Sequence, residues 1–492
     1  MQKKNTTRRR IAAVSVALAT LALTQSTATA ASDPTTVEIK SILDGLTAHP
    51  QSVTEGIERT TYSSATSPLV VRVAVIDPDM GAVTLGSTFG TAVGVKEKTT
   101  AMLATVGTST YDAPYVGVNG SFSVPAKDED AAGDNVHEER SIPMMASVQE
   151  DVVQGASCMK GQNAVVLQHG RPHFTRITTT IEITSDKKTP GTTDDVTRSV
   201  DGLNRYPGWI PFCQQETGDR TIPAQRDADG KVLYYYDQNG RALTGGPFFQ
   251  DYSEIVVFTS AYGQTTPYPN HTPFVAADDA DGVEVALDKN DYVVEVKQTR
   301  GGMTIPPGGK VLQGIGVTQA DGGAKWLTEN APLGAKLTYT QSVKDIGFKK
   351  NPTDDEDPSD DEDIPLNPAY PSVDIVNGTH LLMVNGEVVA VPGSADTAPR
   401  TAIGVDGWGR TLLVTVTAKI QERRGVPIYD LAKVMEDLGA VDALNLDGGG
   451  STTFVADGEV QNILSDGKDK ERPVYDSVYS GRGGHALPAI GN

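Results

Sequence analysis

The sequence predicts an α+β protein that is dominated by strands, with mixed sheets and a few flanking helices. Three observations support this fold class. Short runs of β-branched residues recur and are closed by turn signals, as in Val70–Ile76 before Asp77-Pro78. The chain carries 50 Gly and 29 Pro among 492 residues, which disfavours bundles of long helices. Only a few stretches place apolar residues at helical spacing.

The elements can be assigned in chain order. A helical pattern covers Val37–Leu46, a second helix is expected over Glu97–Val106, and a third over Ile428–Leu438. The third ends at Gly439, a typical C-cap residue. Strands are expected in eight further runs, namely Ala164–Gln168, Glu254–Thr259, Tyr292–Lys297, Leu337–Thr340, His380–Val384, Glu387–Val391, Ala402–Val405 and Thr411–Val416.

The organisation along the chain predicts one large domain over residues 55–485, preceded by a lead-in over 31–54. Residues 205–250 are interpreted as an insertion rich in Gly, Asp, Tyr and Gln. An acidic loop covers 353–364, because eight of the ten residues in Asp354–Asp363 are acidic and repel one another. A linker between two domains is the alternative. A calcium site there is possible but not indicated, since the regular spacing of a calcium loop is missing, and no cofactor is expected.

Residues 1–30 predict an export signal, so that the mature protein would be secreted and extracellular. The segment starts with five basic residues, continues with an apolar run over 11–23 that is too short to span a bilayer, and ends in Ala28-Thr29-Ala30, a small-x-small cleavage site. A retained anchor helix is the alternative. In an exported chain Cys158 and Cys213 favour a disulfide over two separate buried thiols.

The charge balance excludes some partners. The formal net charge is −21, from 63 acidic and 42 basic residues, and cleavage after the signal would make it −26. A nucleic-acid partner held through its phosphates needs the opposite balance. Attachment to an anionic membrane surface is disfavoured for the same reason.

The most informative stretch is Ala443–Val455, which contains a strand, a glycine-rich turn and a second strand. A hairpin turn is its simplest interpretation. Three successive glycines are entropically costly, however, and two hydroxyls follow them, on Ser451 and Thr452. Backbone N–H groups in such a loop can hold an anion, and Asp447 supplies one carboxylate at the rim. The stretch therefore indicates an anion or substrate site.

Several motifs, taken in the order in which they occur along the chain, resemble those of the phosphodiester glycosidase family over residues 55–480. The two most specific are Asn445-Leu-Asp-Gly-Gly-Gly-Ser-Thr-Thr453 and Pro399-Arg-Thr-Ala-Ile-Gly404. The other matching segments are Val116–Phe122, Gly202–Arg205, Ser465–Gly467 and Glu471–Pro473.

The resemblance implies hydrolysis of a sugar 1-phosphate diester at the anomeric carbon, with a phosphate-bearing glycan as substrate. Asp447 would be the reacting carboxylate, as nucleophile or as base for water, with Glu471 or Asp466 as the second carboxylate. Further residues would bind the sugar or the phosphate: Asn119, Arg400, Asn445, Gly448, Gly449, Gly450, Ser451, Thr452 and Arg472. A phosphate monoester has a second pKa of about 6, so the leaving group needs charge neutralisation more than protonation.

Alternatives remain open at several positions. Arg400 and Arg472 could instead pair with acidic neighbours, Asn119 could cap a turn, and His380 is interpreted as a structural polar residue. The family usually has Gly where this chain has Ser121, and Asp-Gly-Arg where it has Thr417-Ala-Lys419. Two other functions are therefore kept: a secreted glycan-binding protein with a degenerate site, and a phosphodiesterase that breaks the P–O bond, a reaction that often uses two metals.

Overall fold

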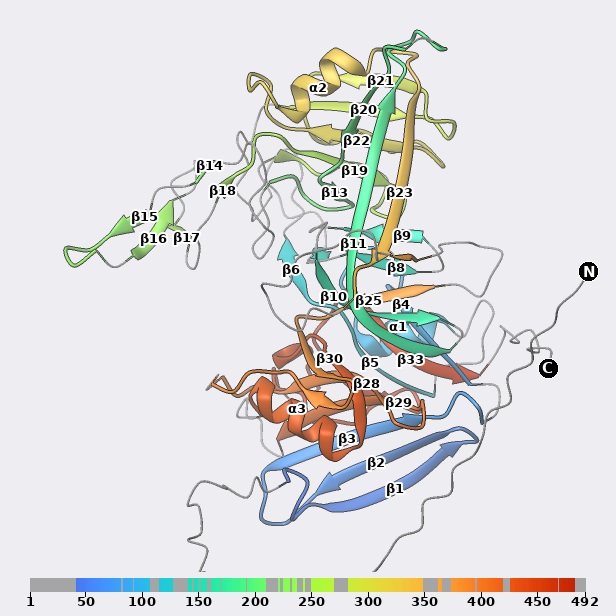
Figure 1. The fold of residues 1–492 in the computed structure, drawn as a ribbon, viewed down its shortest axis with the longest axis vertical. Helices are drawn as coiled ribbons and strands as arrows, with labels where there is room; N and C mark the ends of the chain where they lie inside the picture. Colours follow the sequence, from blue (N-terminus) through green and yellow to red (C-terminus); the bar gives the residue numbers. More distant parts are fainter. Residues whose placement is uncertain are drawn as a thin grey trace, which may run out of the picture. The chain divides into compact units, whose positions relative to one another are not determined.

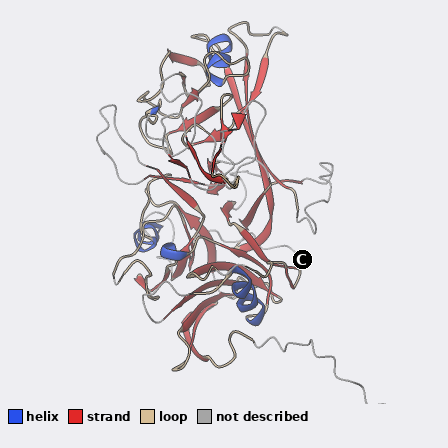
Figure 2. Ribbon diagram, turned by 90° about the vertical axis from the view of Figure 1, so that its left-hand side faces the viewer, coloured by secondary structure: helices blue, strands red, loops and turns tan. Residues whose placement is uncertain are grey.

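The structure is a computed structural model. It describes residues 41–80, 83–91, 93–106, 115–126, 140–143, 146–149, 152–156, 161–168, 170–191, 193–208, 220–221, 224–230, 232–236, 242–243, 249–269, 282–347, 362–364, 373–393, 396–418, 425–467 and 469–482. The predicted export signal, Cys158, Cys213 and most of the acidic loop lie outside these residues. The described residues belong to a compact unit that begins at Ser41, and strands dominate it (Figure 2).

The first sheet has eight strands in the order β1-β2-β3-β29-β28-β30-β26-β27. Their bounds are Thr47–Thr54, Ile57–Ser63, Leu69–Ile76, Thr411–Ala418, Arg400–Asp406, Ala440–Asn445, His380–Val384 and Glu387–Val388. Helix α3 (Ile428–Asp437) lies against β26, β28 and β30 (Figure 1). Four of its apolar residues, Leu431, Ala432, Val434 and Met435, are fully buried. The helix ends at Gly439, whose φ of 82° is readily adopted by glycine.

The second sheet has five strands in the order β32-β31-β5-β33-β4. Their bounds are Glu459–Val460, Phe454–Ala456, Val116–Asn119, Ser477–Arg482 and Val83–Thr88. Helix α1 (Thr99–Val106) contacts β4, β5 and β33. One buried apolar cluster joins this sheet to the first sheet, through side chains such as Val118, Phe454 and Leu444.

The third sheet follows the order β24-β23-β11-β10-β25-β8-β9, with β12 paired to β11. The bounds in that order are Glu362–Asp363, Leu337–Asp345, Arg171–Ser185, Gln162–Gln168, Asp374–Asn377, Ser147–Gln149 and Val152–Gly155, and β12 is Val196–Ser199. Val165 and Val376 of this sheet join the cluster shared by the first two sheets. Three sheets therefore meet around one core.

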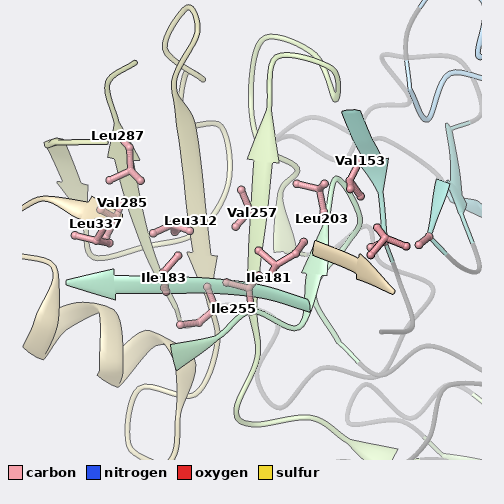
Figure 3. Close-up of a cluster of buried hydrophobic side chains, with 14 of the residues drawn as sticks. Val153, Ile181, Ile183, Leu203, Ile255, Val257, Val285, Leu287, Leu312 and Leu337 are labelled. Atoms are coloured by element: carbon pink, nitrogen blue, oxygen red, sulfur yellow. The ribbon is translucent and has the colours of Figure 1, made fainter. Parts of the chain in front are cut away.

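The fourth sheet follows the order β13-β19-β22-β20-β21. Its strands are Gly202–Leu203, Ile255–Thr259, Lys310–Gly314, Val283–Leu287 and Val293–Lys297, and helix α2 (Gly323–Asn330) contacts β20 and β22. The long strand β11 places Ile181 and Ile183 in a core with Ile255 and Leu312 of this sheet (Figure 3). The remaining short strands are β14 (Arg220–Thr221) with β18 (Phe249–Gln250), β15 (Ala224–Arg226) with β16 (Val232–Tyr236) and β17 (Ala242–Leu243), and β6 (Ser123–Ala126) with β7 (Arg140–Pro143).

The strand-dominated prediction is confirmed, and so are the helices near 97–106 and 428–438. The sheets are less mixed than expected, because among the described strand pairs only β13 with β19 is parallel. The helix predicted over Val37–Leu46 is wrong for its described part: residues 42–45 form a turn with Gly45 at φ 85°, and β1 follows. A helix this short is marginal by itself, and these residues instead contact the end of α3, because Ser41 Oγ and the Leu43 N–H donate to Asp437 Oδ2 at 2.7 and 3.3 Å. The acidic run ends in β24, which pairs with β23.

Candidate active site

The glycine-rich loop crosses between two sheets. Strand β30 ends at Asn445 in the first sheet, whereas β31 begins at Phe454 in the second. The simple hairpin interpretation is therefore wrong. Leu444 and Leu446 are buried in the core that both sheets share, which draws the chain from one sheet to the other. Gly449–Ser451 form a single 3-10 turn in this crossing.

Asn119 holds the loop in place. It is the last residue of β5 and is fully buried. Its Oδ1 accepts hydrogen bonds from Thr401 Oγ1 at 2.7 Å and from the Thr453 N–H at 3.1 Å, and its Nδ2 donates to the carbonyl oxygen of Asp447 at 2.7 Å. The amide thus joins β28 to both ends of the glycine run. Since protein atoms satisfy this side chain, we assign Asn119 to positioning the loop.

Asp447 is the partly exposed carboxylate of the loop. Its Oδ1 accepts the Gly448 N–H at 2.8 Å, and Ser451 bonds the carboxylate as well. Burial raises the pKa of Asp447 above its ordinary value, while these hydrogen bonds and the positive charges of Arg472 and Lys96 oppose the rise. A carboxylate that is desolvated and still faces cations suits a nucleophile or a base for water. The sequence motifs did not reveal Lys96, whose charge acts on Asp447.

Asp476 is a second carboxylate, missed by the sequence analysis. It directly precedes β33, is fully buried, and accepts the Ser121 N–H at 2.5 Å and the Ser121 Oγ–H at 2.7 Å. Gly120 lies between the two acids, because its N–H donates to the Asp476 carbonyl and its carbonyl accepts the Asp447 N–H. Burial raises the pKa of Asp476 to about 6, and the negative charge of Asp447 adds to the rise.

The departure at Ser121 could have signalled this second acid. A buried carboxylate needs hydrogen-bond donors, and glycine at position 121 would offer only its N–H. Ser121 adds a hydroxyl, which also accepts the Asn377 N–H at 3.2 Å. The side chain therefore joins β25 to Asp476.

The two acids predicted as second carboxylates have other partners. Glu471 accepts the Thr100 N–H at 2.9 Å and the Thr100 Oγ–H at 2.6 Å, so it caps the first turn of α1. Asp466 accepts two hydrogen bonds from Arg472, at 2.6 and 2.7 Å. The structure therefore favours Asp476 over both as the acid coupled to Asp447.

Arg472 and Arg400 lie against opposite parts of the glycine run. A Cβ on Gly450 would collide with the Arg472 guanidinium, and one on Gly448 would lie 3.7 Å from Cδ of Arg400. Arg400 donates from Nε to the Val426 carbonyl at 3.0 Å and from Nη2 to the Asp396 carbonyl at 2.8 Å. Both arginines have acidic partners, as the alternative interpretation expected, and both still border the loop.

The remaining predicted residues surround the same loop. Asn445 donates from Nδ2 to Thr379 Oγ1 at 3.0 Å, and within the described part of the chain Asn445 Oδ1 and Thr452 Oγ1 are buried without a hydrogen-bond partner. Gly449 has a φ of 63°, which glycine adopts without strain. Val416 of β29 pairs with Arg400, and Thr417 is the next residue along β29. The Thr417 Oγ1 accepts a hydrogen bond from Arg72 at 3.4 Å.

A cluster of metal ligands and a membrane-spanning helix are both missing from the residues that the structure describes. No three or more His, Cys, Asp and Glu side chains gather there as a set that could hold a metal ion. None of the helices in the described ranges has both the length and the apolar character required to cross a bilayer.

Fold and site together define a strand-rich protein with two coupled carboxylates and flanking cations where three sheets meet. Residues 281–479 match the family model of phosphodiester glycosidases. This match confirms the resemblance for the motifs within 281–479, whereas the motifs at 116–122 and 202–205 lie outside it. It includes Asp447, Asp476, Arg400 and Arg472, whereas Asn119 lies outside it.

Individual relatives match only in part. The N-acetylglucosamine-1-phosphodiester alpha-N-acetylglucosaminidase of Mus musculus is 30% identical over 118 residues, covering 20% of this chain and 23% of that protein. The enzyme of the same name from Homo sapiens is 40% identical over 67 residues, covering 14% of this chain and 13% of that protein. The matched region thus covers less than a quarter of the length of each of these relatives. A solved structure from Burkholderia pseudomallei K96243 has a TM-score of 0.59 at 22% identity, covers 85% of this chain and 75% of its own, and shows a shared fold.

Proposed function

We propose that the protein is a secreted hydrolase that cleaves the glycosyl C1–O bond of a sugar 1-phosphate diester in an extracellular phosphate-bearing glycan. The observation that carries the proposal is Asp447, a partly exposed carboxylate held by the glycine loop through the Gly448 N–H, whose pKa is raised by partial desolvation and lowered by the positive charges of Arg472 and Lys96. The family match and the activity named for the mouse and human relatives agree with this reaction class.

The arrangement supports a simple division of roles. Asp447 attacks C1 or activates water for that attack, and the C1–O bond breaks with its electrons passing to the phosphate oxygen. Water supplies the hydroxyl to C1 and the proton that is released, so the products are a free sugar and a phosphomonoester. The departing phosphate needs little protonation at neutral pH, and the arginines beside the loop neutralise its charge. Asp476 is fully buried, so it acts on Asp447 through the electric field rather than on the substrate.

A turnover assay tests the proposal. The mature protein is offered a panel of sugar 1-phosphate diesters and the matching aryl glycosides, with and without chelator. We expect hydrolysis of diesters in the wild type and loss of turnover in Asp447→Asn, because the amide is neither a nucleophile nor a base. Asp469→Asn is the matched control, since Asp469 is exposed and has a φ of 63° that asparagine tolerates. Full activity of Asp447→Asn would refute the assignment.

Two alternatives have their own readouts. Hydrolysis in ¹⁸O-water labels the sugar if the C–O bond breaks and the phosphate if the P–O bond breaks. Saturable binding of a phosphoglycan without product would favour a degenerate binding protein, the alternative motivated by Thr417-Ala-Lys419. Secretion is tested separately by N-terminal sequencing of exported protein, which should begin after Ala30.

A further inference from the structure

His380 and Arg400 begin the two strands, β26 and β28, that pair with β30 on either side. His380 begins β26 and pairs with Asn445, while Asn445 pairs on its other side with Ala402 of β28, the strand that begins at Arg400. The two side chains therefore flank the end of β30, directly before the Asp447 loop. His380 is exposed, and its Nε2 has no hydrogen-bond partner among the described residues. The Arg400 Nη1 has none there either.

A chain of hydrogen bonds leads from Asn445 through Thr379 to the imidazole of His380. Asn445 Nδ2 can only donate, and it donates to Thr379 Oγ1 at 3.0 Å. The same hydroxyl oxygen lies 2.8 Å from His380 Nδ1. The Thr379 hydroxyl can donate its single hydrogen to His380 Nδ1, which accepts it when the imidazole proton is on Nε2. We therefore assign the imidazole proton to Nε2, which points away from this chain of bonds and remains a donor.

The electrostatics around His380 favour the neutral imidazole. Desolvation and the positive charge of Arg400 both lower the pKa of His380. Arg400 in turn has an ion pair with Asp396, whose side chain is 79% exposed and whose Oδ2 is 3.5 Å from Nη2, so solvent screens the pair. By contrast, Arg472 is held in a bidentate pair by Asp466. The positive charge beside His380 is therefore less neutralised by the protein than the charge beside Asp447.

We propose that His380 Nε2–H and Arg400 Nη1 together bind the non-bridging oxygens of the phosphate, making His380 a specificity-determining residue for phosphate-bearing substrates. The identity of the ligand rests on the proposed function. The two donors flank the loop on the Arg400 side, while Arg472 and Lys96 face Asp447. The site thus divides into a phosphate subsite and a reacting carboxylate. This role replaces the interpretation of His380 as a purely structural residue.

The test measures binding of inorganic phosphate by calorimetry to the wild type, His380→Ala, His380→Gln and His49→Ala. A hydrogen bond to a charged group is lost in His380→Ala, so phosphate should bind at least about tenfold more weakly. In His380→Gln the amide Nε2 can replace the imidazole donor and should restore most of the affinity. His49 is an exposed histidine on β1 and serves as the matched control. Thermal unfolding shows whether each variant is folded.

The outcomes separate this inference from the proposed function. Equal phosphate affinity of wild type and His380→Ala would overturn it, as would absence of binding to the wild type or a His380→Gln variant as weak as His380→Ala. If turnover is found, KM for the diester should rise about tenfold in His380→Ala, and kcat should change less. If no diester is hydrolysed while the phosphate affinities still differ as stated, the proposed function fails and the phosphate subsite stands.

Discussion

The buried carboxylate of Asp476 should make the stability of the protein depend on pH in a way that a single substitution removes. Its two oxygens accept hydrogen bonds from Ser121, and it has no exposure to solvent. Asp476→Asn keeps the shape and lets the new amide donate to Ser121 Oγ, while it removes the titrating group.

The magnitude follows from the pKa. The ordinary value is 3.8, and burial beside Asp447 raises the folded-state pKa to about 6. Between these values the folded protein binds more protons than the unfolded chain, so the free energy of unfolding falls as pH rises. The contribution of Asp476 protonation to the free energy of unfolding is present below about pH 4 and lost above about pH 6. Its full size is about 3 kcal/mol, at ~1.4 kcal/mol per pKa unit.

Urea unfolding at several values between pH 4 and pH 7 measures this effect. The free energy of unfolding of Asp476→Asn, minus that of the wild type, should grow by about 2.4 kcal/mol from pH 4 to pH 7. Asp469→Asn, at an exposed position, should show no such growth. Parallel curves for wild type and Asp476→Asn across this range would refute the reasoning, because Asp476 would then have an ordinary pKa.

Three further predictions concern the same loop. Asn119→Ala loses three hydrogen bonds and should cost about 3 kcal/mol of stability, at ~1 kcal/mol each, and also lower kcat, which thermal unfolding and turnover assays would check. Gly450→Ala forces the Arg472 guanidinium to move and should reduce turnover more than Gly458→Ala, a turn glycine with open space around it; equal effects would contradict the packing argument. Glu471→Ala removes the cap of α1 and should cost about 1 kcal/mol while turnover persists, whereas complete loss of turnover in a folded variant would restore Glu471 as a catalytic acid.

The sequence by itself determined the strand-rich fold class, two of the three described helices and the loop that carries Asp447. These features are local: β-branched runs, helical spacing and a short glycine motif are complete within a few residues. For the same reason the sequence pattern misjudged Val37–Leu46, where the described residues form a turn that is hydrogen-bonded to Asp437 of α3 rather than a helix.

The tertiary structure alone decided how the site is assembled. Ser121 and Asp476 are 355 residues apart in the chain, yet Ser121 donates the two hydrogen bonds that hold the buried carboxylate of Asp476 in the site. Asp466 and Glu471 stood nearer to Asp447 in the sequence, but the fold turned them toward Arg472 and α1. A carboxylate's pKa and role depend on burial and on the donors around it, and these are set by which strands end side by side.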